Sequence, residues 1–479
     1  MSELENGAGA EADASARYRA LSDSELPLHV GALAVLDGPV DAEALERRVR
    51  ERAAAIPRLG FASERAAAAW LAGARRRATG RRPGFVERVA TTPPGGDAEL
   101  SATVAELWSR PLASDGPRWE IAVVDGLARG RTAVLVKAHR SIANDGGGPQ
   151  LAELLLGSAP PPGARAVARR RDKRPAGALP ATVPARGVAS ALAAMSLPLF
   201  AGTRAVGRAF ADVLDPATAL ARARDVARWL EATSLVVSTP APETPFNGPL
   251  GGARRVGWVR LARDVLAGIE EAMEAPRSAV VLAILGDALG RYLKLRGRVT
   301  VALELPALVD PLEPSGEAAA GAIVSLPVGA VAARARVVTL SAALRDPAAR
   351  ARRASFDSVV SAALLLPTGG RSVGAALAYQ AVNTISVEAR ATGGSGELAG
   401  RRCIFLVPIA SLPWHVGLSF AWLDWGAEEV VVGIDADTAL APDVEAVEDC
   451  LRAAYVEAAA SAGVPAIDPE RRMRVAQSP

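Results

Sequence analysis

Strand-like and helix-like stretches alternate along both halves of this 479-residue chain, on either side of a segment rich in proline, glycine and arginine. That segment, APPPGARAVARRRDKRPAGALPATVPARG, covers residues 159–187 and has the composition of a linker. Alternating strands and helices are typical of the α/β or mixed α+β class. The sequence therefore predicts two similar α/β halves with a cleft between them.

The same pattern predicts limits for each region of the chain. We expect a disordered N-terminus over 1–20, an N-terminal half over 21–158, a linker and helical connector over 159–250, a C-terminal half over 251–462 and a tail over 463–479. The first twenty residues are polar and lack the apolar core of a signal peptide.

Apolar runs and amphipathic stretches indicate the individual elements. In the first half we expect strands at 28–38, 121–127 and 132–138, the last two joined at Ala128-Arg129-Gly130, and helices at 41–55 and 149–156. In the second half we expect strands at 256–262, 299–305, 321–331 and 403–409, a hairpin over 418–434, and helices at 264–274, 279–295 and 441–461.

Composition excludes several classes of function. The net charge is only +3, so nothing indicates a nucleic-acid partner. The two cysteines stand alone, which fits a reducing compartment such as the cytoplasm. Three scattered histidines have no metal-ligand spacing, so we expect no metal and no bound cofactor.

One uncharged stretch, 187–203, bears on the membrane. It is short for a span and contains Pro198, so it indicates either a buried or amphipathic helix or a peripheral lipid contact. With the basic run 169–174 it predicts peripheral, salt-sensitive association with a membrane or lipid-droplet surface.

The stretch KAHRSIANDGGGPQ, residues 137–150, contains one of the three histidines. It follows an apolar run and precedes a helix opened by Pro149, so His139 and Asp145 lie in a glycine-rich turn between strand and helix. A polar turn at the end of a buried strand is a candidate active site.

Several stretches, in order, resemble the bacterial wax ester synthase/diacylglycerol acyltransferase family. They are PLHVGALAVLDGPVDAEALERRVRERAAAIPRL, PLASDGPRWEIAVVDGLARGRTAVLVKAH, FNGPLGGARRVGWVRL, AVVLAILGDALGRYL and LAGRRCIFLVPIASLPWHVGLSF, and together they extend from about Leu21 to Ala460. The resemblance implies two chloramphenicol-acetyltransferase-like halves with a helical connector and an interdomain tunnel. In that tunnel acyl-coenzyme A, as co-substrate, would meet a long-chain alcohol or diacylglycerol.

The family motif HHxxxDG is altered here. Without a gap, His139 takes the first histidine slot, Arg140 the second, Asn144 the aspartate slot and Asp145 the glycine slot. A shift by one residue restores Asp145-Gly146 but places Arg140 and Ser141 in the histidine slots. In the family, the second histidine takes the proton from the acceptor hydroxyl. Arginine stays protonated and has no lone pair to accept it.

The candidate site residues follow from this comparison. His139, either as an unorthodox base in a turned loop or as a structural histidine, Asn144 and Asp145 are catalytic candidates. Arg140, Gly146 and Ser278 are candidates for substrate binding; Arg140 would pair with a phosphate or carboxylate, and Ser278-Ala279 replaces an Asn-Asp pair of the family. A Ser-Asn-Val-Pro-Gly-Pro turn of the family corresponds to 386–391, without its prolines.

Two functions remain open. One is an acyl-coenzyme A-dependent O-acyltransferase that makes wax ester or triacylglycerol. The other is a catalytically impaired homologue that binds acyl-coenzyme A, lipid or a partner protein.

Overall fold

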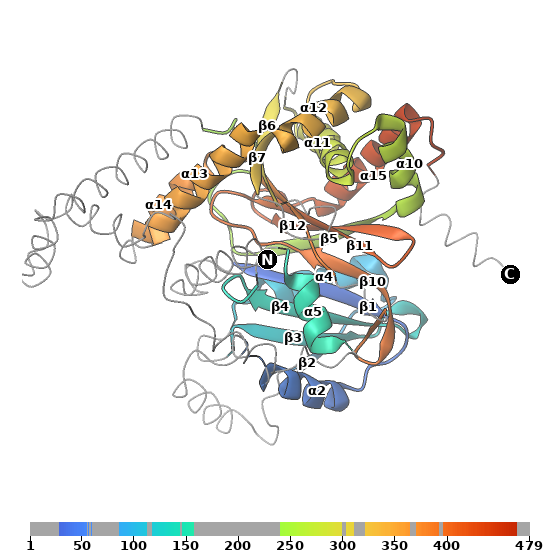
Figure 1. The fold of residues 1–479 in the computed structure, drawn as a ribbon. Coiled ribbons are helices and arrows are strands. Elements are labelled where there is room, and N and C mark those ends of the chain that lie inside the picture. The colour runs from blue at the N-terminus through green and yellow to red at the C-terminus, as the bar shows by residue number, and fades with distance from the viewer. Residues whose placement is uncertain are drawn as a thin grey trace, which may run out of the picture.

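The computed structural model describes residues 28–54, 56, 59, 86–112, 117–143, 146–157, 240–298, 303–310, 321–364, 370–391 and 396–466. The predictions made for 1–20, for 187–203 and for the tail beyond 466 lie outside these residues, as does the connector up to 239. Two six-stranded sheets form the frame of the molecule, one below the other in Figure 1, with helices packed around them.

The first sheet has the strand order β2-β3-β4-β1-β10-β9. Its strands are β1 (His29–Leu36), β2 (Val86–Ala90), β3 (Trp119–Asp125), β4 (Thr132–His139), β9 (Glu397–Leu398) and β10 (Arg401–Ile409). The hairpin of β3 and β4 turns through a short 3-10 helix at Ala128–Gly130, where Arg129 has φ 63°. This confirms the predicted turn, since the positive φ reverses the chain within three residues.

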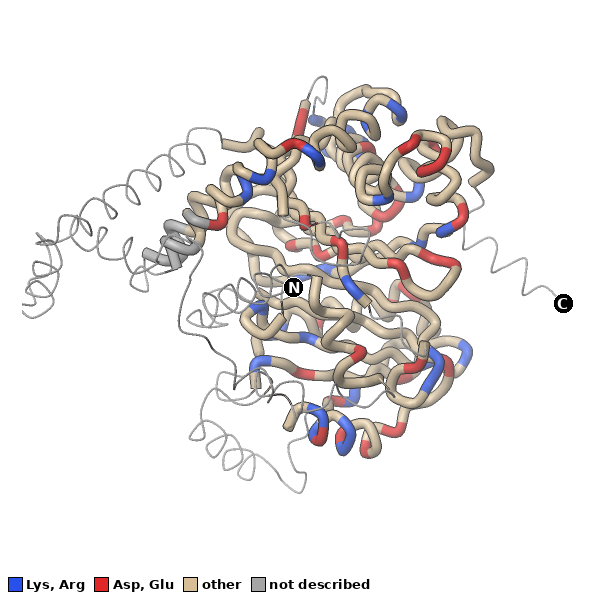
Figure 2. Tube along the Cα trace, in the orientation of Figure 1, with Lys and Arg blue, Asp and Glu red and all other residues tan. Residues whose placement is uncertain are grey.

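Among the described residues, the helices that accompany the first sheet are α2 (Ala42–Ala54), α4 (Asp97–Ser109) and α5 (Gly148–Leu156). Helix α2 buries Leu45, Val49 and Ala53 at helical spacing, while its other face carries charges of both signs, which Figure 2 shows at the bottom of the molecule. Helix α4 lies against both halves: Ser101 Oγ donates to the carbonyl of Val256 at 2.5 Å, and Trp108 is fully buried.

The second sheet has the order β5-β12-β11-β8-β6-β7. Its strands are β5 (Arg254–Ala262), β6 (Glu304–Asp310), β7 (Ala322–Pro327), β8 (Thr384–Glu388), β11 (Leu418–Trp425) and β12 (Glu429–Asp437). The hairpin of β11 and β12 is antiparallel from Leu418 opposite Ala436 to Trp425 opposite Glu429, as the sequence predicts.

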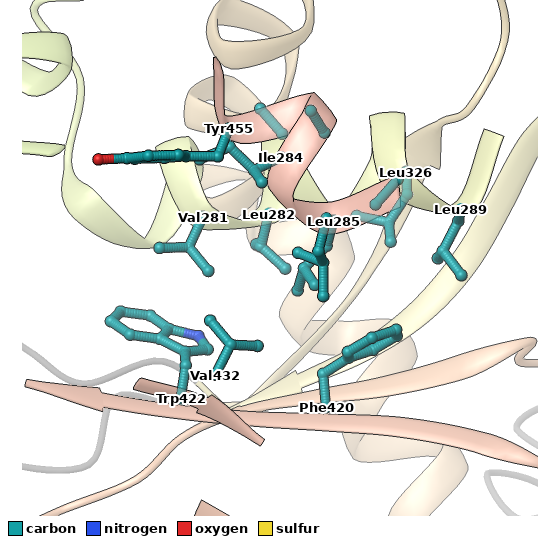
Figure 3. Close-up of a cluster of buried hydrophobic side chains, with 14 of the residues drawn as sticks. Val281, Leu282, Ile284, Leu285, Leu289, Leu326, Phe420, Trp422, Val432 and Tyr455 are labelled. Atoms are coloured by element: carbon teal, nitrogen blue, oxygen red, sulfur yellow. The ribbon is translucent and has the colours of Figure 1, made fainter. Parts of the chain in front are cut away.

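One face of the second sheet is covered by helices. These are α10 (Arg263–Met273), α11 (Arg277–Leu295), α12 (Ala333–Arg345) and α15 (Val444–Ser461). Figure 3 shows Phe420, Trp422 and Val432 rising from the sheet toward Val281, Leu282 and Leu285 of α11. Two more helices, α13 (Pro347–Leu364) and α14 (Gly370–Tyr379), extend to the left of the body in Figure 1.

Strands β9 and β10 lie in the second half of the sequence but belong to the first sheet. Strand β10 pairs antiparallel with β1, from Gly31 opposite Ile409 to Leu36 opposite Cys403. It also approaches the second sheet closely, since a Cβ added to Gly433 of β12 would lie 1.8 Å from the carbonyl oxygen of Pro408. The division of strands between the sheets therefore does not follow the division of the chain at its connector.

Three expected elements need correction. The strand expected at 299–305 is β6, which runs from Glu304 to Asp310 and continues through Pro306 although prolines are rare inside strands. The strand expected at 321–331 ends at Pro327. Residues 386–388, compared above with a turn, form the end of strand β8, which pairs in parallel with β11 on one side and with β6 on the other.

Candidate active site

The last residue of β4 brings His139 to the edge of the first sheet. In the antiparallel register of β1 and β4, His139 stands directly opposite His29, and the two side chains are 1% and 2% exposed. The next residue leaves the strand: the backbone N–H of Arg140 donates to the carbonyl of Leu28 at 2.8 Å, and its side chain is half-buried. The two residues in the motif's histidine slots therefore have different surroundings.

Hydrogen bonds at Nδ1 define the state of His139. The backbone N–H of Ser141 donates to Nδ1 at 3.1 Å, the Ser141 hydroxyl lies 2.8 Å away and Arg118 Nη1 lies 3.4 Å away. An amide can only donate, so Nδ1 accepts and the proton of the neutral imidazole lies on Nε2. In this tautomer Nε2 is a hydrogen-bond donor and not a base.

The glycine-rich turn is held from two sides. A Cβ on Gly148, the first residue of α5, would lie 2.0 Å from the carbonyl oxygen of Gly31, so only glycine allows the helix to begin this close to β1. On the other side, the carbonyl of Gly146 accepts from the backbone N–H of Arg390 at 3.3 Å. The turn thus bridges the first sheet and the end of β8 in the second.

The structure brings together some of the predicted site residues. His139, Arg140 and Gly146 lie along the turn after β4, whereas Asn144 and Asp145 lie outside the described residues. Ser278 is half-buried in the first turn of α11, on the helical layer of the second half (Figure 1). The end of β8 does meet the turn, since an added Cβ on Gly146 would lie 3.1 Å from Val387 Cγ1.

A buried chain of side chains leads from the two histidines to the second sheet. The Trp108 carbonyl is 3.1 Å from Nδ1 of His29, and the two rings meet edge to face at 5.8 Å. Trp108 Nε1 donates to Oδ2 of Asp435 on β12 at 3.0 Å. Beside it, the buried guanidinium of Arg254 pairs with Asp437 at 2.5 Å.

Sequence reasoning missed Arg118 and Asp435 as neighbours of this site. Arg118 could have been found by counting back from the turn at 128–130, because the hairpin register places it opposite His139, whose N–H donates to its carbonyl at 2.9 Å. For Asp435 the signal is an acid inside the apolar strand EVVVGIDAD. Such a charge is rarely buried without a specific partner.

The described residues also bear on metal binding and on membrane insertion. In that part of the chain, no three His, Cys, Asp or Glu side chains are grouped as a metal ion would require. None of the helices described is both long enough and apolar enough to cross a bilayer.

Comparison with known sequences identifies the family. The sequence profile of the wax ester synthase/diacylglycerol acyltransferase catalytic domain matches residues 12–275, more than half of the 479-residue chain. The chain belongs to the wax ester synthase/diacylglycerol acyltransferase family. The matched region includes β1, β4, the motif turn and α5, so the predicted resemblance is confirmed.

Mycobacterial members of the family are among the similar proteins. One from Mycobacterium tuberculosis, provisionally named a diacylglycerol O-acyltransferase, is 31% identical over 217 residues, which are 44% of this chain and 39% of the relative. Another so named, from Mycobacterium bovis, is 30% identical over 57% of this chain and 52% of its own length. The chain thus spans about half or less of these relatives.

Solved structures show the same fold. The wax ester synthase/diacylglycerol acyltransferase of Marinobacter aquaeolei VT8 aligns with a TM-score of 0.57 at 16% identity, over 91% of this chain and 95% of that one. The first condensation domain of the calcium-dependent antibiotic synthetase aligns with a TM-score of 0.51 at 14% identity, over 95% and 97%. These matches confirm the predicted mixed α/β class with chloramphenicol-acetyltransferase-like halves; the interdomain tunnel stays a prediction.

Proposed function

We propose that the chain is an acyl-coenzyme A-dependent O-acyltransferase that esterifies a long-chain alcohol or a diacylglycerol. One observation carries the proposal: the family match covers the strand, turn and helix around His139, and these are embedded in the family's fold. Acyl-coenzyme A would be the co-substrate, and no cofactor is needed because a thioester is already an activated acyl donor.

The motif residues suit part of this reaction. With its proton on Nε2, His139 can donate a hydrogen bond to the thioester carbonyl oxygen as negative charge develops there. Arg140 remains a cation, which suits a phosphate of coenzyme A or a carboxylate. Neither side chain, in these states, takes the proton from the acceptor hydroxyl, so this step needs another group or proceeds slowly.

The second candidate is a homologue that binds acyl-coenzyme A or lipid without turnover. It is favoured by the donors around Nδ1 of His139 and by arginine in the slot of the base. General-base catalysis contributes about 10²–10⁴-fold to a rate, so its loss alone does not abolish the reaction.

Ester formation by the purified full chain distinguishes the two candidates. Palmitoyl-coenzyme A is offered with hexadecanol or with dioleoylglycerol, and the ester and free thiol are quantified while acyl-coenzyme A binding is measured in parallel. Ester with stoichiometric thiol supports the acyltransferase. Saturable binding without ester supports the binding protein, and the absence of both contradicts the two candidates together.

A further inference from the structure

Asp435 and Ser419 lie on the face of the second sheet that is turned toward the first. Phe420 and Val432 of the same strands point to α11 in Figure 3, and side chains alternate along a strand. On the inner face, Leu423 and Val431 pack in one hydrophobic cluster with Trp108 and with strands of the first sheet. Ser419 lies four residues from Leu423 on β11, and Asp435 lies four residues from Val431 on β12. Residues an even number apart in a strand point to the same face, so Asp435 and Ser419 also face the space between the sheets.

These two side chains hold buried polar atoms that find no hydrogen-bond partner in the part of the chain that the structure describes. Asp435 is 2% exposed and Ser419 0% exposed, and among the described residues neither Oδ1 of Asp435 nor Oγ of Ser419 has a partner. The two residues are direct cross-strand neighbours on β12 and β11, yet their oxygens do not bond each other. Buried polar atoms are nearly always paired, so this spot fits a polar group of a ligand.

The place of this pair in the molecule connects it with the motif. Oδ2 of Asp435 accepts from Trp108, whose ring meets His29, and His29 stands opposite His139. Cross-strand partners point to one face of a sheet, so His139 points to the same face as His29. His139 therefore points toward the second sheet and Asp435 toward the first, with Trp108 between them. Oδ1 is the carboxylate atom that has no hydrogen-bond partner among the described residues.

We propose that Asp435 and Ser419 form the hydroxyl site of the acyl acceptor, with Asp435 as the proton acceptor that the motif turn lacks. This inference rests on the proposed acyltransferase function. The acceptor oxygen, held by Ser419, forms a bond to the thioester carbon while its proton passes to Oδ1 of Asp435. The carbon–sulfur bond then breaks, and Asp435 gives the proton to the departing sulfur. Coenzyme A leaves as the thiol, and the carboxylate of Asp435 is regenerated.

The electrostatics of Asp435 suit this task. Burial raises the pKa of its carboxyl from 3.8 to about 7, and neighbouring Asp437 also raises it, whereas Arg254 of β5, the bond from Trp108 of α4 and the backbone N–H of Ala436 act in the opposite direction. On the first sheet, the imidazole of His29 is in contact with the ring of Trp108, which donates to Asp435. A base with a pKa near the working pH combines a useful ionised fraction with sufficient proton affinity.

The test compares Asp435→Asn, Ser419→Ala and a matched control, Glu429→Gln, in the ester-formation assay between pH 5.5 and pH 8.5, roughly 1.5 units either side of the expected pKa. Asparagine keeps the acceptor for Trp108 but cannot take a proton. Glu429 is a carboxylate of the same strand that pairs with Arg260 instead. We expect Asp435→Asn to lower kcat/KM by about 10²-fold or more, Ser419→Ala to raise KM, and Glu429→Gln to leave both unchanged.

The pH profile separates Asp435 from other groups. In the wild type, kcat/KM should rise with pH through about 7 as the carboxyl loses its proton, and the rise should disappear in Asp435→Asn. Because an imidazole titrates in the same range, the rise must persist in His139→Ala. If Asp435→Asn does not fold, a wild-type profile that is flat near pH 7 overturns the proposal.

The outcomes keep the two proposals apart. A wild type that makes ester, with an Asp435→Asn variant of equal rate and equal pH profile, overturns the role of Asp435 alone. A wild type that makes no ester at any pH overturns the acyltransferase function and this inference with it.

Discussion

At the scale of single residues, Arg140 decides how much activity the motif turn can have. We expect Arg140→His to raise ester formation from a low baseline, by up to about 10²-fold, because a second imidazole would supply a base in the family's slot. Arg129→His, at the exposed turn of the β3–β4 hairpin, is the matched control and should change nothing. If the wild type is fully active and Arg140→His abolishes turnover, the ungapped placement of the motif is wrong.

Asp435 also makes the free energy of unfolding depend on pH. Its pKa in the folded chain, about 7, lies above the 3.8 of an exposed carboxyl, so the folded state binds more protons between these values. Its contribution to stability is therefore full below about pH 4 and is lost as pH rises through about 7.

We expect Asp435→Asn to remove this dependence. Thermal unfolding of the two proteins followed by circular dichroism at pH 5 to 8, roughly the range of this ionisation, measures it. The Tm of the variant minus the Tm of the wild type should increase as pH rises. Parallel curves over the whole range would mean that Asp435 does not titrate in the folded protein.

The motif residues also show what sequence alone can predict about a site. The position of His139 at the end of a strand and the glycine-rich turn follow from local pattern, and the structure has both. The tautomer of His139 does not follow, because it depends on Arg118 and Ser141 meeting Nδ1 in three dimensions. The link from Trp108 to Asp435 joins residues 327 positions apart, which no pattern in the sequence indicates.

At the scale of elements, regular apolar alternation made the hairpins and the long helices predictable. The ends of β3, β4, β11 and α11 fall within three residues of expectation. Strand β2 was missed because it lies at the sheet edge with no fully buried residue, so its sequence VERVA has no clear pattern. Helices α12 and α13 were missed because alanine and arginine spread over both faces hide the helical period.

The close approach of β12 to β10 at Gly433 should be sensitive to one methyl group. A side chain at Gly433 would collide with the carbonyl oxygen of Pro408, so Gly433→Ala must push β12 and β10 apart. We expect a loss of about 1–3 kcal/mol of stability in urea unfolding. In Gly96→Ala the new methyl would meet only the flexible end of Glu99, so this control should change stability by less than about 1 kcal/mol.

At the scale of the whole molecule, the second half of the chain supplies β9 and β10 to the first sheet and the two sheets share a hydrophobic cluster, so we expect them to unfold together. Strand β10 pairs with β1 and packs on β12, and one hydrophobic cluster contains residues of both sheets. Calorimetry of the intact chain should give a single transition with equal calorimetric and van't Hoff enthalpies. Two resolved transitions would show that each half is stable without the other.

Association with membranes remains a prediction at this scale, since 187–203 and the basic run lie outside the described residues. The full chain should sediment with vesicles containing phosphatidylserine at low salt and be released at about 1 M salt, where charges are screened within about 3 Å. Vesicles of phosphatidylcholine alone are the control. Retention through both high salt and alkaline carbonate would argue for integral insertion.

The second half of the sequence contributes β10 to the first sheet, and this has a consequence for the newly made chain. The ribosome releases β1 to β4 long before residue 401, so until β10 arrives the open edge of β1 offers unpaired N–H and C=O groups beside apolar side chains. Nascent or truncated chains that end before β9 would therefore be prone to edge-to-edge aggregation. The first sheet is complete only after residues 397–409 have been made, and a chaperone that covers a strand edge would act during this interval.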